Sequence, residues 1–213
     1  MRSLAFKQLE SEPEQIEETG RVLSQGGLVC LPCSNSYRIV ADLTSEDAVE
    51  RLLQSKSRTR KAPSLVFVDS EEMLRQVAAE VNPAAVQIAR RIWPQPVTIL
   101  FDAHPELPRW VVKQLVRANG KIGVRIPDNA VVTRVISALG RPLLVSSANK
   151  ERKKGAGSPA QVKKNFAKRI DLFIDAGELP QALGSTVVDV EGGQVTVTRP
   201  GSITADRISD IVG

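Results

Sequence analysis

Apolar residues in this chain are grouped in two ways: in short continuous runs, and in longer segments where they recur every three or four positions. A short apolar run bounded by glycine or proline is typical of a buried strand, and the longer spacing is typical of one face of a helix. Helices are therefore predicted at 13–25, 44–53, 70–80, 82–92, 108–118, 129–139 and 204–211, with a short one that begins at Pro159. Strands are predicted at 28–31, 65–68, 97–101, 122–126, 143–146, 172–174, 186–190 and 194–198.

Predicted strands and helices alternate along most of the chain, which is typical of an α/β fold in which helices flank a sheet. Gly192-Gly193 separates the last two strands at hairpin spacing, so these strands are expected to pair antiparallel and the sheet to be mixed. No linker-like stretch divides the sequence, and we predict a single domain over residues 1–213. Pro32 is expected to end the strand at 28–31.

The composition is that of a globular protein, with 42% hydrophobic and 25% charged residues. Aromatic residues are only 4%, so the core must consist of Val, Leu, Ile and Ala. No apolar run approaches the roughly 20 residues that cross a bilayer. Residues 1–18 are polar and acidic and do not resemble a signal peptide, so a cytoplasmic protein without membrane contact is predicted.

The net charge of +5 indicates either phosphate-bearing ligands or RNA, or a solvated basic surface without a partner. Cys30 and Cys33 form a C-x-x-C pair at the end of an apolar run rather than at a helix N-terminus. A zinc site would need more ligands, and His104 is the only histidine. We therefore predict no metal site in the protein, a buried Cys30 and a Cys33 in a loop.

The chain contains no dinucleotide-binding or Walker A glycine pattern, no metalloprotease motif and no nucleophile elbow. Covalent catalysis is therefore disfavoured, and the candidate residues are polar side chains near strand ends, where α/β folds bind ligands. One group is the cation cluster that follows the helix at 44–53, which would bind phosphate or carboxylate or would be a solvated helix end. Its members are Lys56, Arg58, Arg60 and Lys61.

Two further groups leave alternatives open. Ser147 and Asn149 follow an apolar strand and would either bind a nucleotide or form a turn. Arg125 lies inside an apolar strand and needs an anionic partner, either a structural carboxylate or a substrate carboxylate, and Arg199 has the same ambiguity. The polar segment 149–158 is predicted to be a mobile loop that becomes ordered over bound nucleotide.

Five stretches in order, over about residues 12–201, resemble the YrdC family of threonylcarbamoyl-AMP synthases in its short, single-domain form. They are Lys56-Ser57-Arg58 with Pro63; Trp93-Pro94-Gln95-Pro96-Val97-Thr98; Gly123-Val124-Arg125-Ile126-Pro127; Ser147-Ala148-Asn149; and Gly184-Ser185-Thr186-Val187-Val188-Asp189 with Arg199-Pro200-Gly201. The resemblance implies a twisted mixed α/β sheet with a basic concave groove.

It also implies an enzyme that joins L-threonine, bicarbonate and ATP into threonylcarbamoyl-adenylate and releases pyrophosphate. That product serves a transferase complex that modifies adenosine 37 of tRNA, and tRNA or double-stranded RNA is implied as a further partner. Catalysis would rest on positioning and charge neutralisation, with Mg²⁺ on the ATP phosphates. By position, Lys56, Arg58, Ser147 and Asn149 would be catalytic and would bind ATP with Arg60 and Arg199, and Asn35, Arg125 and Ser185 would bind threonine.

The sequence departs from the family in one loop above all. The family's P-T-D-T-x-Y-G-L is here Pro32-Cys33-Ser34-Asn35-Ser36-Tyr37-Arg38-Ile39, which keeps Pro32 and Tyr37 but replaces both threonines, the aspartate and the glycine. Lys150-Glu151-Arg152 also replaces the residues that follow S-A-N in the family. Two alternatives therefore stay open: a paralogue that binds nucleotide or RNA in the same groove without this chemistry, and a carbamoyl-adenylate enzyme with a different amine substrate.

Overall fold

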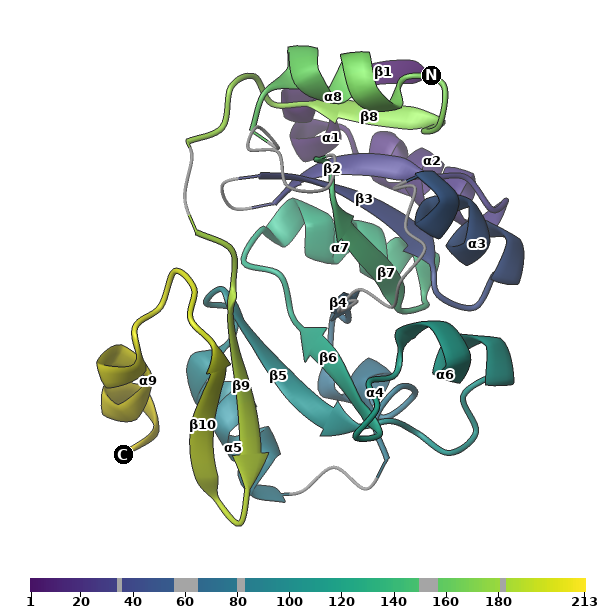
Figure 1. The fold of residues 1–213 in the computed structure, drawn as a ribbon. Helices are drawn as coiled ribbons and strands as arrows, with labels where there is room; N and C mark the ends of the chain where they lie inside the picture. Colours follow the sequence, from purple (N-terminus) through teal and green to yellow (C-terminus); the bar gives the residue numbers. More distant parts are fainter. Residues whose placement is uncertain (34–35, 56–64, 80–82, 150–156, 181–182) are drawn as a thin grey trace.

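The structure, a computed structural model, describes residues 1–33, 36–55, 65–79, 83–149, 157–180 and 183–213. A single mixed sheet of ten strands runs through the molecule in the order β1-β8-β2-β3-β7-β4-β6-β5-β9-β10. The sheet is strongly twisted. In Figure 1, β2 and β3 run from side to side, whereas β9 and β10 run from top to bottom. In chain order the strands are β1 (Arg2–Ala5), β2 (Val29–Cys33), β3 (Ser36–Asp42), β4 (Leu65–Phe67), β5 (Val97–Asp102), β6 (Lys121–Arg125), β7 (Leu143–Ser147), β8 (Leu172–Asp175), β9 (Thr186–Glu191) and β10 (Gln194–Arg199).

Helices pack on the sheet and on one another. Helix α2 packs on α7, α3 packs on β3, and α5 packs on β5, β9 and α9. None of the helices within the described ranges has the length and hydrophobicity needed to span a membrane. The helices are α1 (Phe6–Ser11), α2 (Pro13–Ser24), α3 (Glu46–Ser55), α4 (Glu71–Leu74), α5 (Pro83–Ile92), α6 (Arg109–Leu115), α7 (Ala130–Leu139), α8 (Pro159–Phe166) and α9 (Ala205–Val212).

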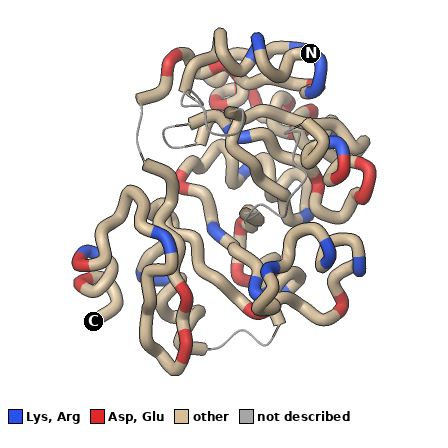
Figure 2. Tube along the Cα trace, in the orientation of Figure 1, with Lys and Arg blue, Asp and Glu red and all other residues tan. Residues whose placement is uncertain are grey.

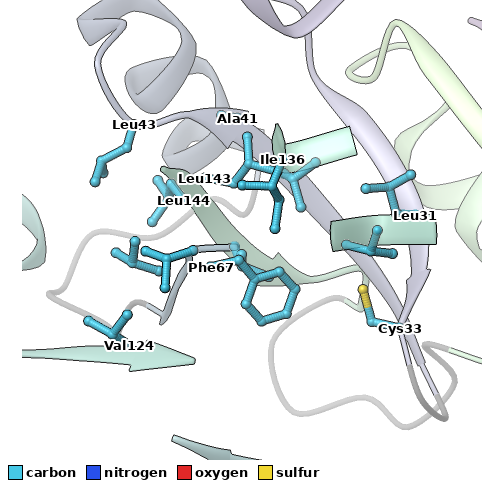
Figure 3. Close-up of a cluster of buried hydrophobic side chains, with 14 of the residues drawn as sticks. Leu31, Cys33, Ala41, Leu43, Phe67, Val124, Ile136, Leu143 and Leu144 are labelled. Carbon is cyan, nitrogen blue, oxygen red and sulfur yellow. The ribbon is translucent and has the colours of Figure 1, made fainter. Parts of the chain in front are cut away.

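Helix α7 shows how local sequence sets an element's ends. The Asn129 side chain accepts hydrogen bonds from the backbone N–H groups of Val131 and Val132, which satisfies two donors of the first turn. Gly140 ends the helix with a φ of 71°, a left-handed conformation that favours glycine. The buried face of α7 then packs into a largely aliphatic core, and Ile136 is one of the core side chains that Figure 3 labels.

The mixed α/β sheet and its terminal antiparallel hairpin are confirmed, with β10 paired antiparallel to β9. The strand end predicted at Pro32 is wrong, because β2 continues to Cys33 and Pro32 lies opposite Tyr37 of β3. β2 pairs with β8 only at Val29 and Cys30. Pro32 therefore has a neighbouring strand on one side only, which is where a strand tolerates a residue without a backbone donor.

Two strands and two helices differ from the prediction, and one of these helices is α1, which was not predicted. β1 and the central strand β3 were not predicted, although Ser36 to Ile39 alternate polar and apolar residues as a half-buried strand does. The helix predicted at 70–80 is only the short α4. After it the chain pairs with the end of β5, since the Ala79 N–H donates to the Asp102 carbonyl at 2.8 Å and Ala78 bridges Ala103. Tertiary pairing overrides helix propensity there.

Candidate functional site

A pocket of about 390 Å³ lies over the middle of the sheet. Strand register explains why residues far apart in sequence meet there. Arg38 lies opposite Ser147, Leu65 lies opposite both Val145 and Gly123, and Thr98 lies opposite Val187. Because side chains alternate between the two faces of a sheet, these partners project to one face across β3, β7, β4, β6, β5 and β9. The lining residues are Arg38, Leu65, Thr98, Arg117, Gly123, Val145, Ser146, Ser147, Leu183, Gly184, Ser185, Val187, Arg199 and Pro200.

Three arginines line this pocket, and no Asp or Glu is among its described lining residues. Burial lowers the pKa of Arg199, and the positive charges of Arg38 and Arg117 lower it further. Burial also lowers the pKa of Arg38. Acidic positions are instead grouped on the outer helix α3 and along the β9–β10 hairpin, as Figure 2 shows. The guanidinium groups thus repel one another, and an anionic ligand would relieve that repulsion.

Ser185 and Arg199 are in contact where β9 begins and β10 ends. The Arg199 Nη2 donates to the Ser185 carbonyl oxygen at 2.8 Å and to its Oγ at 3.4 Å. Ser185 Oγ lies 2.9 Å from Thr98 Oγ1, and both side chains are buried. These hydrogen bonds hold Ser185 beside Arg199. Ser185 is a predicted threonine-binding residue, and Arg199 is a predicted ATP-binding residue.

Gly201 makes this arrangement possible. A Cβ atom at Gly201 would lie 2.4 Å from the Gly184 carbonyl oxygen and from the Thr186 nitrogen. The Ser202 N–H donates to the same Gly184 oxygen at 2.9 Å, so the two chain segments lie in direct backbone contact. Only glycine allows so close an approach, which explains the Arg199-Pro200-Gly201 sequence in physical terms.

Ser147 and Asn149 stand at the end of β7. The Ser147 Oγ donates to Asn149 Oδ1 at 2.5 Å, and the Ala148 N–H donates to the Tyr37 carbonyl at 2.9 Å. Ser147 lines the pocket, whereas Asn149 adjoins it through this hydrogen bond. The Tyr37 hydroxyl is fully buried, donates to the Gly177 carbonyl and accepts from the Ala176 N–H, so this tyrosine has a structural role.

Arg125 has the structural partner that the sequence left as one alternative. Its Nη2 donates to Asp128 Oδ1 at 2.7 Å, and its side chain is 4% exposed. The guanidinium also lies 5.8 Å from the centre of the Phe67 ring. Arg125 does not line the pocket described above.

Some predicted site residues lie outside the described part of the chain, namely Asn35, Lys56, Arg58, Arg60 and most of the predicted mobile loop at 149–158. Helix α3 ends at Ser55, directly before the predicted phosphate-binding cluster. Conversely, Arg38, Thr98 and Arg117 line the pocket although their lining roles were not predicted. The alternation around Arg38 was a usable signal, because it places this arginine on the same face of a strand as Ser36.

Both cysteines are buried thiols, so the loop position predicted for Cys33 is wrong. Cys33 ends β2 and belongs to the buried core, two residues after Leu31 on the same strand (Figure 3). Burial raises the pKa of its thiol to about 12. A thiol that is protonated and covered from solvent is a poor nucleophile.

We therefore expect neither Cys30 nor Cys33 to react with a chromogenic disulfide reagent in the folded protein at neutral pH. Both should react completely in denaturant, which supplies the control within one experiment. Rapid reaction of either thiol in the folded protein would contradict its burial.

The sequence matches a known family over most of its length. The family model Sua5_yciO_yrdC, described as "Telomere recombination", matches residues 21–201. A threonylcarbamoyl-AMP synthase of Pyrococcus abyssi is 29% identical over 205 residues, which are 94% of this chain and 59% of that protein. A threonylcarbamoyl-AMP synthase of Halorhodospira halophila is 31% identical over 169 residues, which are 77% of this chain and 84% of that protein.

The fold agrees with these matches. The crystal structure of P. abyssi Sua5 complexed with L-threonine superposes with a TM-score of 0.84 at 28% identity, covering 95% of this chain and 58% of that one. This chain thus spans less than two thirds of the length of the Pyrococcus protein. The family model and the Halorhodospira relative nevertheless each match most of this chain, and the chain therefore belongs to the Sua5/YciO/YrdC family.

Proposed function

We propose that this protein joins L-threonine, bicarbonate and ATP into threonylcarbamoyl-adenylate and releases pyrophosphate. The observation that carries the proposal is the pocket in which Ser147, Ser185 and Arg199 line one cavity. These residues come from three separate stretches that resemble the family, and the fold brings them to one face of the sheet. Relatives over most of this chain are named threonylcarbamoyl-AMP synthases, which supports the same reaction.

The reaction needs positioning and charge neutralisation more than a nucleophilic residue. The threonine amino group and bicarbonate form a carbamate with loss of water. A carbamate oxygen then attacks the α-phosphorus of ATP, and the bond to pyrophosphate breaks. Arg199 would neutralise negative charge in this step, and Ser147 and Ser185 would orient the reactants by hydrogen bonds.

Mg²⁺ would shield the charge of the ATP phosphates. The described residues contain no group of three His, Cys, Asp or Glu side chains that could hold a metal ion. Phosphate oxygens would be its main ligands if, as predicted, Mg²⁺ enters with ATP. The Lys56, Arg58 and Arg60 positions would bind the same phosphates, directly after α3.

The wider role in modification of tRNA adenosine 37, the transferase complex that would take the product, and the cytoplasmic location all stay predictions. So does direct binding of tRNA or double-stranded RNA. The three arginines of the pocket support an anionic ligand, and they fit both the proposed enzyme and a paralogue that only binds nucleotide.

The decisive experiment is a pyrophosphate-release assay with the purified protein, ATP, Mg²⁺ and bicarbonate. We expect release to require L-threonine, because the adenylate forms only from the threonine carbamate. Reactions without bicarbonate or without threonine are the controls. ATP binding without any threonine-dependent release would favour the nucleotide-binding paralogue, and release with another amino acid would favour a different amine substrate.

A further inference from the structure

Arg38 stands where the family loop carries glycine, and its side chain enters the pocket. It lies in the middle of β3, opposite Leu31 of β2 on one side and Ser147 of β7 on the other. It is half-buried and lines the cavity. Within the described part of the chain, no hydrogen bond or ion pair involves its guanidinium, and burial lowers its pKa although the charge of Asp128 opposes that shift.

The neighbouring arginine is in the opposite situation. Arg125 was predicted to hold the threonine carboxylate, but it is nearly fully buried, binds Asp128 and does not line the pocket. The positive charge of Arg38 lowers the pKa of Arg125, and both arginines act on the Cys33 thiol. Of the two arginines, Arg38 is the one that lines the cavity.

The place of Arg38 in the chain favours the amino acid over the nucleotide as its ligand, although Ser147 and Arg199, which are predicted at the nucleotide, line the same cavity. Arg38 follows directly on the loop that, by resemblance, holds the threonine-binding position Asn35. The phosphate-binding positions are predicted elsewhere, after α3 at 56–60. A planar guanidinium also matches a carboxylate through two parallel hydrogen bonds, a geometry that a lysine lacks.

We propose that Arg38 binds the carboxylate of the amino-acid substrate, in place of Arg125, which is held by Asp128. This inference rests on the proposed function. It makes Arg38 a specificity-determining residue of this chain, because the family glycine offers no side chain for the same contact.

The test compares Arg38→Gln, Arg38→Lys and Arg38→Gly, the last of which restores the family residue. In the pyrophosphate-release assay, Arg38→Gln is expected to raise the apparent KM for L-threonine about thirtyfold, as expected for loss of a charge-assisted contact. The KM for ATP should stay within about threefold of the wild-type value. The KM of Arg38→Lys for L-threonine should lie between those of the wild-type protein and Arg38→Gln, because lysine keeps the charge but cannot make two parallel hydrogen bonds to a carboxylate.

Arg207→Gln is the matched control, because Arg207 is exposed on α9 and its loss removes the same charge. The melting temperature of each variant establishes that it is folded. Equal increases in both KM values would show that Arg38 binds phosphate and would overturn the proposal. Unchanged KM values in folded Arg38→Gln would overturn it as well.

Failure of the proposed function is visible separately, as absence of threonine-dependent release by the wild-type protein. In that case calorimetry with L-threonine and with ATP replaces the assay. Threonine binding that is lost in Arg38→Gln while ATP binding persists would support the Arg38 assignment without the reaction. If the wild-type protein binds no L-threonine, the assignment falls together with the proposed function.

Discussion

The Lys56→Ala, Arg58→Ala double variant is expected to bind ATP with Mg²⁺ about a hundredfold more weakly than the wild-type protein. Each side chain is predicted to make a charge-assisted contact to phosphate, and the loss of two such contacts costs on the order of 3 kcal/mol. The measurement is a calorimetric titration with ATP and Mg²⁺ on the purified variant, after its fold has been checked by circular dichroism.

A control for the loss of two charges is Arg109→Ala with Lys113→Ala, two exposed cations on α6. If electrostatic attraction to the whole protein were responsible, this variant would lose affinity to a similar extent. Unchanged ATP affinity in the folded Lys56, Arg58 variant would show that the phosphates bind elsewhere, with the Arg38, Arg117 and Arg199 group as the next candidate.

The second large effect is expected from Gly201→Ala. The added methyl group would lie 2.4 Å from backbone atoms of Gly184 and Thr186, and rigid backbone cannot move aside as a flexible side chain can. Overpacking of this kind costs about 1–3 kcal/mol or more. Because the displaced segment contains Ser185, we expect both a lower melting temperature and a loss of threonine-dependent pyrophosphate release.

Gly184→Ala is the matched control for stability, since a Cβ atom at Gly184 would meet nothing within 4 Å. This variant adds the same methyl group on the facing segment, where there is room for it. Its melting temperature should equal that of the wild-type protein. Equal stability of the Gly201→Ala variant would mean that the backbone at 184–186 can move, and that Gly201 does not hold Ser185 in place.

Elements that depend on local pattern could be predicted well from the sequence. The helix at 129–139 is flanked by Asn129 and Gly140, and both residues perform the capping roles that their chemistry favours. The hairpin around Gly192-Gly193 likewise follows from the turn residues and the strands beside them. Elements without such capping or turn residues were less accessible, as β1 shows, and β3 carries only a short polar–apolar alternation over Ser36 to Ile39.

The candidate site divides in the same way. Ser147, Ser185 and Arg199 were found from residue type, from their places beside strands and from a resemblance to a family, and all three line one pocket. The sequence left two partners open for Arg125, and only the structure identifies Asp128 as one of them. An arginine in an apolar strand indicates that an anionic partner must lie nearby, but the sequence does not show which group provides it.

By itself, therefore, the sequence determined the class of fold, most of the helices and strands, and the motif residues of the candidate site. The tertiary structure decided which side chains share a cavity. The entry of Arg38 into the pocket depends on β3 lying between β2 and β7, and on a register that sets Arg38 opposite Ser147. Register and strand order arise from contacts between residues distant in sequence, and a shift of one position would turn Arg38 to the other face of the sheet.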